Sequence, residues 1–238
     1  MNDQALDRGI SRRHLLLGLG LGATALAAGC TTGPRARILG TYDGGAPLPE
    51  YDSGGLAANY GPIEDGGYQI PAINPKRVDP KFFRQEVADP TGEAPGTIVI
   101  DTTHRFAYLT EGNGRAMRYG IGVGREGFAW SGRAKVQWKR KWPTWTPPSE
   151  MIDRQPELEP YRNGGMEPGL MNPLGARALY LFQDGKDTLY RLHGTPQYWT
   201  IGTAASSGCV RFMNHDIIDL YDRVPDGTPV VVVQNGMV

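Results

Sequence analysis

Apolar and polar residues alternate along the chain from Gly96 onward, between short groups of turn-forming residues. The segment TIVIDTTHRFAYLTEGNGRAMRYGIGVG predicts strands over residues 97–101 and 105–110, then a hairpin turn at Gly112-Asn113-Gly114 and a third strand from Arg115. Further short strands are predicted from the apolar segments AKVQW, ALYLF, LYRLHG and TPVVVVQ. Many short strands at close spacing predict a mainly β fold, either a sandwich or a related barrel.

One helix is predicted, and it follows Asn214, a residue type that often caps the N-terminus of a helix. Four apolar residues recur after it at the spacing of one helical face: Ile217, Leu220, Tyr221 and Val224. Pro225-Asp226-Gly227 ends the helix. The expected fold is therefore a β-sandwich or barrel with this one helix.

Residues 31–94 show no sustained helical or strand period and are rich in Gly, Pro, Asp and Tyr. This composition predicts a tether followed by an irregular extension that packs on the β domain. The chain is thus expected to consist of residues 1–30, a Gly/Pro-rich part over residues 31–94, and a β domain over residues 95–235.

The first 30 residues have the layout of an export signal. The pair Arg12-Arg13 precedes an apolar stretch that is too short and too rich in glycine for a transmembrane helix. The arginine pair and the leucines after it resemble a twin-arginine signal. The motif LAAGC at 26–30 resembles a lipoprotein cleavage box, with alanine at 27 where leucine is usual and Cys30 as the lipidated residue. We expect a periplasmic protein that meets the membrane only through a lipid at Cys30; the alternative is a plain cleaved signal with Cys30 discarded or inert.

Charge and cysteine content limit further the class of protein that this sequence can encode. Lys and Arg number 25, as do Asp and Glu, so the formal net charge is zero. A nucleic-acid-binding protein needs a surplus of cations, so this balance argues against one. The chain has two cysteines, and without Cys30 the exported protein keeps only Cys209. In an oxidising compartment such a thiol is reactive, bonded to another chain, or buried and inert.

The residues around Cys209 favour a reactive thiol over an inert one. His193 ends an apolar strand and is followed by Gly194, and sixteen residues after His193 comes Cys209 in the motif Ser206-Ser207-Gly208-Cys209-Val210-Arg211. A histidine that takes the thiol proton makes the sulfur a nucleophile, giving a thiolate–imidazolium pair. Backbone N–H groups at Gly208 or Cys209 are placed to hold an oxyanion, and Arg211 suits a carboxylate.

This motif resembles the active-site motif of the L,D-transpeptidases with a YkuD-type catalytic domain, which modify bacterial peptidoglycan. The segments KRKWPTWTPPSEMI and NPLGARALYL resemble stretches of the periplasmic branch, and the resemblance covers residues 96–234. It implies a mostly β fold with the cysteine in a cleft. Carried over by position, it implies Cys209 as nucleophile, His193 as general base, and Gly208 and Cys209 as the oxyanion site.

The same resemblance implies that Arg211 orders the site or the substrate, and that Ser206 is the small hydroxyl residue of the family motif. Ser207 departs from the family, because many members have histidine there, and His193 is then the only base near the thiol. The alternatives are that Arg211 forms a surface ion pair and that Ser206 and Ser207 only form a turn.

Other chemistry-bearing residues are expected to be structural. His104 lies in a hairpin turn, His215 lies at a helix start, and His14 lies in the leader. No set of residues has metal-ligand spacing, so no metal is expected. No cofactor is expected either, because the energy of a thioester at Cys209 carries the second step of acyl transfer. The stretch from Trp138 to Trp145 interleaves indoles with cations. It is expected either to form a wall or lid that stacks on sugar rings, or to pack on the domain.

The function predicted is peptidoglycan L,D-transpeptidation by cysteine acyl transfer. A stem peptide acylates Cys209 with release of D-alanine, and an amine of another stem or of a wall-anchored lipoprotein accepts the acyl group. A monomer is expected. One alternative is a hydrolase with the same residues that trims stems or releases lipoprotein. The others are a non-catalytic wall-binding lipoprotein and an unrelated cysteine peptidase.

Overall fold

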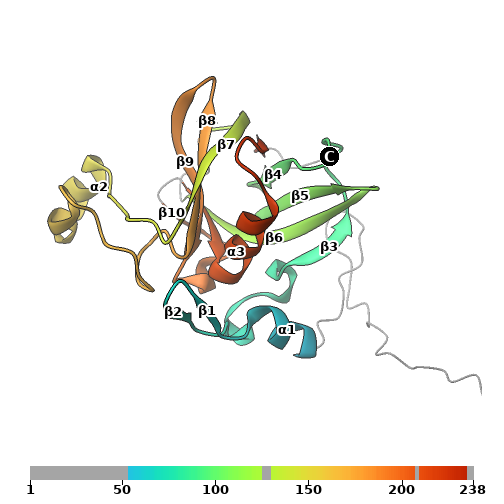
Figure 1. The fold of residues 1–238 in the computed structure, drawn as a ribbon, viewed down its shortest axis with the longest axis horizontal. Helices are drawn as coiled ribbons and strands as arrows, with labels where there is room; N and C mark the ends of the chain where they lie inside the picture. The colour runs from blue at the N-terminus through green and yellow to red at the C-terminus, as the bar shows by residue number, and fades with distance from the viewer. Residues whose placement is uncertain (1–52, 125–129, 207–208, 235–238) are drawn as a thin grey trace, which may run out of the picture. The chain divides into compact units, whose positions relative to one another are not determined.

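The computed structural model describes residues 53–124, 130–206 and 209–234. Eight strands form a closed barrel in the order β6, β11, β9, β8, β7, β12, β4, β5, and β5 pairs with β6 to complete it (Figure 1). Their bounds are β4 Ile98–Asp101, β5 Phe106–Gly112, β6 Arg115–Gly124, β7 Gly132–Lys141, β8 Arg177–Gln183, β9 Lys186–Thr195, β11 Val210–Met213 and β12 Pro229–Val233. The predicted mainly β fold is confirmed, and the architecture is a barrel rather than a sandwich.

All strands predicted from residue 97 onward are present. AKVQW lies within the longer β7, and TPVVVVQ contains β12. Two strands were not predicted: β11 and the three-residue β10 (Ala204–Ser206), which pairs in parallel with β6. Both are too short to show a period, and their hydrogen-bond partners lie far away in the sequence.

Two apolar clusters cover opposite faces of the sheet, and the larger one includes the helix α3 (Asn214–Arg223). In β4 the side chains alternate between them: Ile98 and Ile100 join the larger cluster and Val99 joins the smaller. A strand buried on both faces reads as a continuous apolar run, which explains the sequence TIVI.

The predicted helix is confirmed as α3, but Asn214 does not cap it. The N-cap residue is Met213, without a side-chain cap, and Asn214 is the first helical residue. Its side-chain oxygen instead accepts a hydrogen bond from the backbone N–H of Ala176, at 3.0 Å. The amide therefore joins α3 to the loop before β8.

Residues 53–88 are more regular than predicted. They form α1 Ser53–Tyr60, the hairpin of β1 Ile63–Asp65 and β2 Tyr68–Ile70, the 3₁₀ turns η1 Pro75–Arg77 and η2 Pro80–Phe82, and β3 Gln85–Ala88. These elements are short, and contacts with the barrel rather than local periodicity stabilise them. β3 pairs antiparallel with β6, and Phe82 and Phe83 belong to the smaller apolar cluster.

An ion pair also joins this segment to the barrel. Both side-chain oxygens of Asp65 accept hydrogen bonds from the guanidinium of Arg177 at 2.7 Å, and Trp142 Nε1 donates to Asp65 Oδ2 at 2.7 Å. Arg177 is only 1% exposed. A buried guanidinium needs a countercharge, so the β1–β2 hairpin is part of the folded domain.

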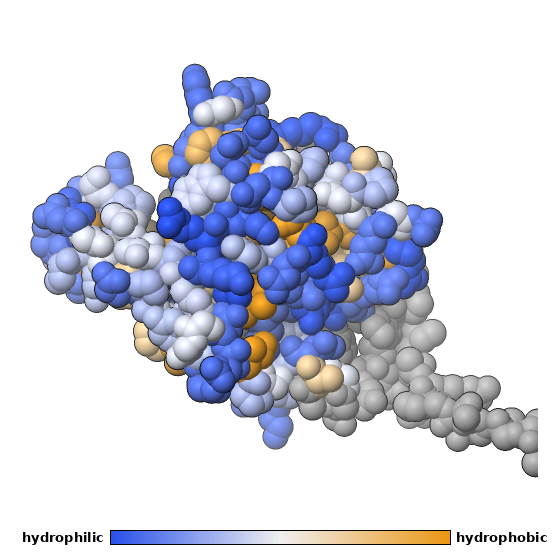
Figure 2. All heavy atoms as spheres, viewed as in Figure 1, coloured by the Kyte–Doolittle hydropathy of each residue, from blue (hydrophilic) through white to orange (hydrophobic). Residues whose placement is uncertain are grey.

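The long connection between β7 and β8 carries α2 (Ser149–Arg154) and η3 (Pro156–Tyr161), which extend away from the barrel at the left of Figure 1. No helix in the described residues is long and apolar enough to cross a membrane. Figure 2 shows a mainly hydrophilic face, on which hydrophobic residues reach the surface only in small patches.

Candidate active site

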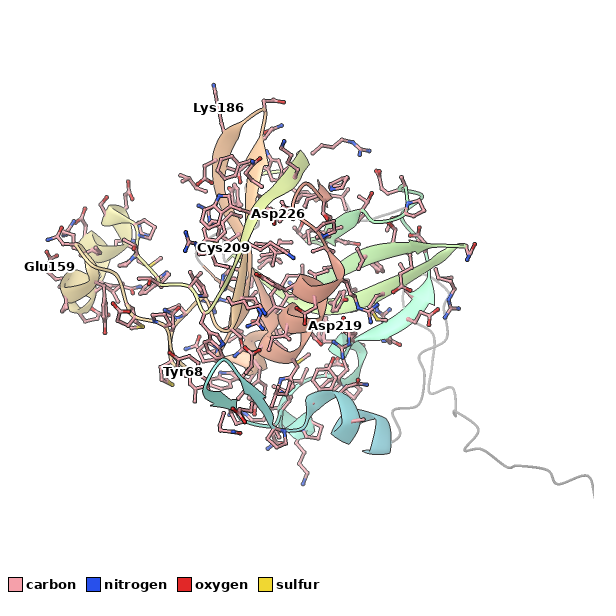
Figure 3. The ribbon with its side chains drawn as sticks, in the orientation of Figure 1. Tyr68, Glu159, Lys186, Cys209, Asp219 and Asp226 are labelled. Carbon is pink, nitrogen blue, oxygen red and sulfur yellow. The ribbon has the colours of Figure 1, made fainter. Side chains whose placement is uncertain are left out.

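The parallel pairing of β9 and β11 brings the segments of the two predicted catalytic residues together. Leu192 pairs with Val210 and His193 pairs with Arg211. Leu192 and Val210 are fully buried in the main core, so His193 and Arg211 point to the opposite face. Cys209 directly precedes β11, and the backbone N–H of Arg191 donates a hydrogen bond to its sulfur, so Cys209 lies beside β9 (Figure 3).

His193 is held in one orientation. It is 4% exposed, and its Nδ1–H donates to the backbone carbonyl of Gly194, at 2.6 Å. A neutral imidazole that donates through Nδ1 has its lone pair at Nε2, which is the acceptor that a general base needs. Burial lowers the pKa of His193 to about 4, with the positive charges of Arg211 and Arg191 adding to that effect.

Cys209 keeps partial exposure to solvent. Its surroundings still desolvate the sulfur, which raises the pKa of the thiol above its ordinary value. The backbone N–H of Arg191 and the charges of Arg191 and Arg211 act in the opposite direction but do not reverse it. With a lowered imidazole pKa and a raised thiol pKa, the resting pair is neutral at pH 7. This differs from the thiolate–imidazolium pair that the sequence analysis anticipates.

The structure describes only some of the remaining predicted site residues. Ser207 and Gly208 lie outside the described residues, as does Cys30. Ser206 is the last residue of β10. Gly194 faces α3, where an added Cβ would lie 2.2 Å from the Asn214 side-chain oxygen, so its contribution to the site is the carbonyl that orients His193.

On β6, Arg211 pairs with a glycine, Gly122. A Cβ on Gly122 would lie 3.0 Å from the backbone oxygen of Thr200. The glycine thus lets the 3₁₀ turn η4 (Tyr198–Thr200) pack close to β6 beside Arg211. The turn lies on the connection between His193 and Cys209.

The other two predicted structural histidines make local contacts. His104 Nδ1 lies 2.7 Å from Asp101 Oδ2, and His215 Nε2 lies 2.7 Å from the carbonyl oxygen of Gly61. Among the described residues, no group of three or more His, Cys, Asp or Glu is arranged to hold a metal ion.

Arg191 was not predicted as a site residue, although its charge acts on both reacting groups. Its backbone N–H and its charge act on Cys209, and its charge acts on His193. A signal for it existed: Arg191 lies two residues before His193 in a predicted strand, so period-two alternation puts both side chains on one face.

The tryptophans between Trp138 and Trp145 make different kinds of contact. Trp142 hydrogen-bonds Asp65 and contacts Tyr68 at 4.1 Å between ring centroids, and Trp145 lies against Tyr161 at 6.4 Å. These two indoles pack on the domain. Trp138 instead lies on the face that carries His193, where it stacks on Tyr180.

Comparison with known proteins identifies the family of this chain. The family model of the YkuD L,D-transpeptidase catalytic domain matches residues 95–232. The chain therefore belongs to the L,D-transpeptidase catalytic domain family.

Two curated relatives from Escherichia coli K12 carry the same family name. The protein named probable L,D-transpeptidase YbiS is 34% identical over 157 residues, which is 61% of this chain and 47% of the relative. The protein named probable L,D-transpeptidase ErfK/SrfK is 30% identical over 167 residues, or 67% of this chain and 50% of the relative. The chain thus spans about half the length of these relatives.

Among solved structures, a Brucella melitensis protein titled probable carnitine operon oxidoreductase caia is 53% identical and covers 67% of this chain and 99% of its own, with a TM-score of 0.46. L,D-transpeptidase 3 of Mycobacterium tuberculosis is 15% identical over 58% of this chain and 60% of its own, with a TM-score of 0.41. Both TM-scores are low, so family membership rests on the domain match and the curated relatives.

Proposed function

We propose that this protein is a peptidoglycan L,D-transpeptidase in which Cys209 is the nucleophile and His193 the general base. The observation that supports this proposal is the parallel register of β9 and β11, because Cys209 directly precedes β11 and His193 pairs with Arg211. The His193 Nδ1–H bond to the Gly194 carbonyl supports it, because it leaves Nε2 as the proton acceptor.

The reaction begins from the neutral pair. Nε2 of His193 takes the thiol proton as sulfur attacks the carbonyl at the L-centre of the diamino acid in a donor stem. The backbone N–H groups at Gly208 and Cys209 are the proposed oxyanion donors. When the tetrahedral intermediate collapses, the imidazolium gives its proton to the leaving amine of D-alanine, and a thioester remains on Cys209.

An acceptor amine completes the cycle. The amine attacks the thioester carbonyl, His193 takes a proton from the amine, and that proton returns to the departing sulfur. The thioester supplies the energy for this step. The amine of a second stem gives a cross-link, and a lipoprotein amine gives attachment to the wall; water as acceptor makes the same site a hydrolase.

The proposed location of this chemistry is the periplasm, because residues 1–30 resemble an export signal, with a lipid at Cys30. Mass spectrometry of the mature N-terminus tests this part. A diacylglyceryl-modified Cys30 supports lipidation, and a chain that begins at another residue contradicts it.

The test of function is the analysis of products from purified stem tetrapeptide with wild type, Cys209→Ala and the control Cys30→Ala. We expect D-alanine release and dimeric products from wild type and Cys30→Ala, and none from Cys209→Ala. We expect His193→Asn to lower the rate by ~10²–10⁴-fold, the usual contribution of a general base. Shortened monomers in place of dimers indicate hydrolysis, and full activity of Cys209→Ala refutes the proposal.

A further inference from the structure

Four side chains form a ladder on the face of the sheet that carries His193. Trp138 and Arg140 come from β7, Tyr180 from β8 and Arg191 from β9, and the strand register pairs Trp138 with Tyr180 and Tyr180 with Arg191. The Trp138 and Tyr180 rings stack with centroids 3.5 Å apart. The Arg191 guanidinium lies 4.4 Å from the centroid of Tyr180, and that of Arg140 lies 5.1 Å from that of Trp138. We call these residues the cation–aromatic ladder.

The ladder does not suit stacking on a sugar ring. Tyr180 lies on the middle strand, so Trp138 covers one face of its ring and Arg191 covers the other. The Arg140 guanidinium also lies over the Trp138 ring. Because the ring faces are occupied, the groups that remain for a ligand are the guanidinium edges.

The two arginines differ in availability. Arg191 Nη1 and Nη2 donate to the two oxygens of Asp187 at 2.7 and 2.8 Å, so its charge is already paired. Arg140 is exposed and makes no ion pair with any described residue. The aromatic stack holds Arg140 in place, which lowers the conformational entropy that ligand binding costs.

An open depression of about 470 Å³ lies beside Arg140 and is lined by Trp138, Lys139, Arg140 and Lys141. It lies where β7 has lost one neighbour, since β12 pairs with β7 only as far as Lys135. The ammonium group of Lys139 is already hydrogen-bonded within the protein, because its Nζ donates to the carbonyl oxygens of Tyr221 and Val224 at 2.8 and 2.5 Å. Lys141 is exposed and, like Arg140, has no ion pair within the described chain. Lys141 follows Arg140 in β7 and so points to the opposite face, where its Nζ lies 5.9 Å from the ring centroid of Tyr221. On the face of His193, β7 therefore offers one available cation, Arg140, to an anionic ligand.

Arg140 lies on the same face of the sheet as His193. Arg140 pairs with Ala178, and Ala178 pairs with His193, so the three lie in one row across adjacent strands. Two strand spacings of about 4.8 Å put Arg140 ~10 Å from His193, or about three residues of extended peptide at ~3.3 Å each. Ala178, the residue between them, has only a methyl side chain.

We infer that Arg140 binds a free carboxylate of the donor stem peptide while its reacting carbonyl lies at Cys209. The inference rests on the proposed function for the identity of the peptide, and on charge complementarity and the row that Arg140 shares with His193 for its placement. It specifies an extended peptide with a carboxylate two strand spacings, or ~10 Å, from His193. A charge-assisted hydrogen bond of this kind gives both affinity and register.

The experiment measures binding in the Cys209→Ala background, so that it does not depend on turnover. Calorimetry with a stem tetrapeptide compares three proteins: Cys209→Ala alone, with Arg140→Gln, and with Lys135→Gln. Lys135 is an exposed cation of the same strand outside the depression. We expect Arg140→Gln to raise Kd about tenfold, the loss of one hydrogen bond between charged groups, and Lys135→Gln to leave Kd unchanged.

A peptide with amidated carboxylates separates this contact from a general charge effect. We expect amidation to weaken binding to the Arg140 protein and to have little further effect on the Arg140→Gln protein. Equal Kd values for the Arg140 and Arg140→Gln proteins overturn the inference. Failure of wild type to release D-alanine overturns the proposed function instead, and the two failures are therefore distinguishable.

Discussion

At the scale of single residues, the neutral state of the Cys209–His193 pair determines how the site responds to pH. Burial and two nearby arginines lower the pKa of His193 to about 4, and burial raises the pKa of Cys209. Below its pKa the imidazole is protonated and cannot accept the thiol proton. A base with an ordinary histidine pKa would lose activity near pH 6.5.

We therefore expect kcat/KM for D-alanine release to stay high from neutral pH down to about pH 5 and to fall as the pH drops through about 4. Initial rates over this range measure the profile. Enzyme held at pH 4 and assayed at pH 7 controls for unfolding. An acidic limb centred near 6.5 contradicts the predicted burial of the imidazole.

Most of the candidate site could be predicted at this scale, since the motif around Cys209 and the Gly194 that follows His193 are visible as residue types. The charge states could not. They depend on burial within the folded sheet and on the charges of Arg191 on β9 and Arg211 on β11, which are not adjacent in sequence.

At the scale of elements, η2 supports the connection between His193 and Cys209. Phe82 lies against two glycines: a Cβ on Gly120 would lie 2.3 Å from the Phe82 carbonyl oxygen, and a Cβ on Gly202 would lie 2.1 Å from its ring. Phe82 is buried, so its ring has little room to move. A residue outside the matched family domain thus packs against the turn that precedes β10.

We expect Gly202→Ala to destabilise the fold more than Gly185→Ala. Both glycines have left-handed backbones, with φ of +83° and +77°, but a Cβ at Gly185 meets nothing within 4 Å. The shared backbone strain costs ~1–2 kcal/mol, and the clash with Phe82 adds ~1–3 kcal/mol at Gly202 only. Urea unfolding of both variants measures the difference, and equal losses would show that Phe82 does not restrict this position.

The elements of residues 53–88 were the least predictable from sequence. α1 and β1 to β3 are short, and no period distinguishes them from loop. Asp65 and Phe82 are ordered by Arg177 and Gly202, which lie more than a hundred residues away. In contrast, α3 and the long strands show their periods locally and were predicted.

At the scale of the whole molecule, a buried carboxyl group links α3 to the N-terminal elements. Asp216 is fully buried; its Oδ1 accepts a hydrogen bond from the Tyr60 hydroxyl at 2.8 Å and lies 3.9 Å from Arg84 Nη1. Asp219 and His215 of the same helix also lie in this region, and Asp219 pairs with Arg84 at 3.1 Å. Burial raises the pKa of Asp216 to about 7, and Arg84 only partly offsets this effect.

A carboxyl group with a raised pKa binds its proton more tightly in the folded than in the unfolded state. Between pH ~4, where the unfolded group titrates, and pH 7, the folded protein holds more protons, so its contribution to the free energy of unfolding falls as pH rises. We expect Asp216→Asn to remove this dependence, and Asp222→Asn, an exposed site on α3, to preserve it. Thermal unfolding at pH 5 and pH 8 measures it, and an unchanged pH dependence in Asp216→Asn contradicts the prediction.

The sequence by itself determined the β class of the fold, the helix α3, the strands from residue 97 onward, and the residue types of the candidate site. These follow from local periods and from the spacing of a few residues along the chain. Only the tertiary structure decided the closure of the barrel through the pairings of β6 with β11 and of β4 with β12, the union of residues 53–88 with it, and the row that joins His193 to Arg140. The physical reason is register: alternation specifies which side chains of one strand share a face, whereas hydrogen bonding and packing between distant segments determine which strands lie side by side and how far each is shifted.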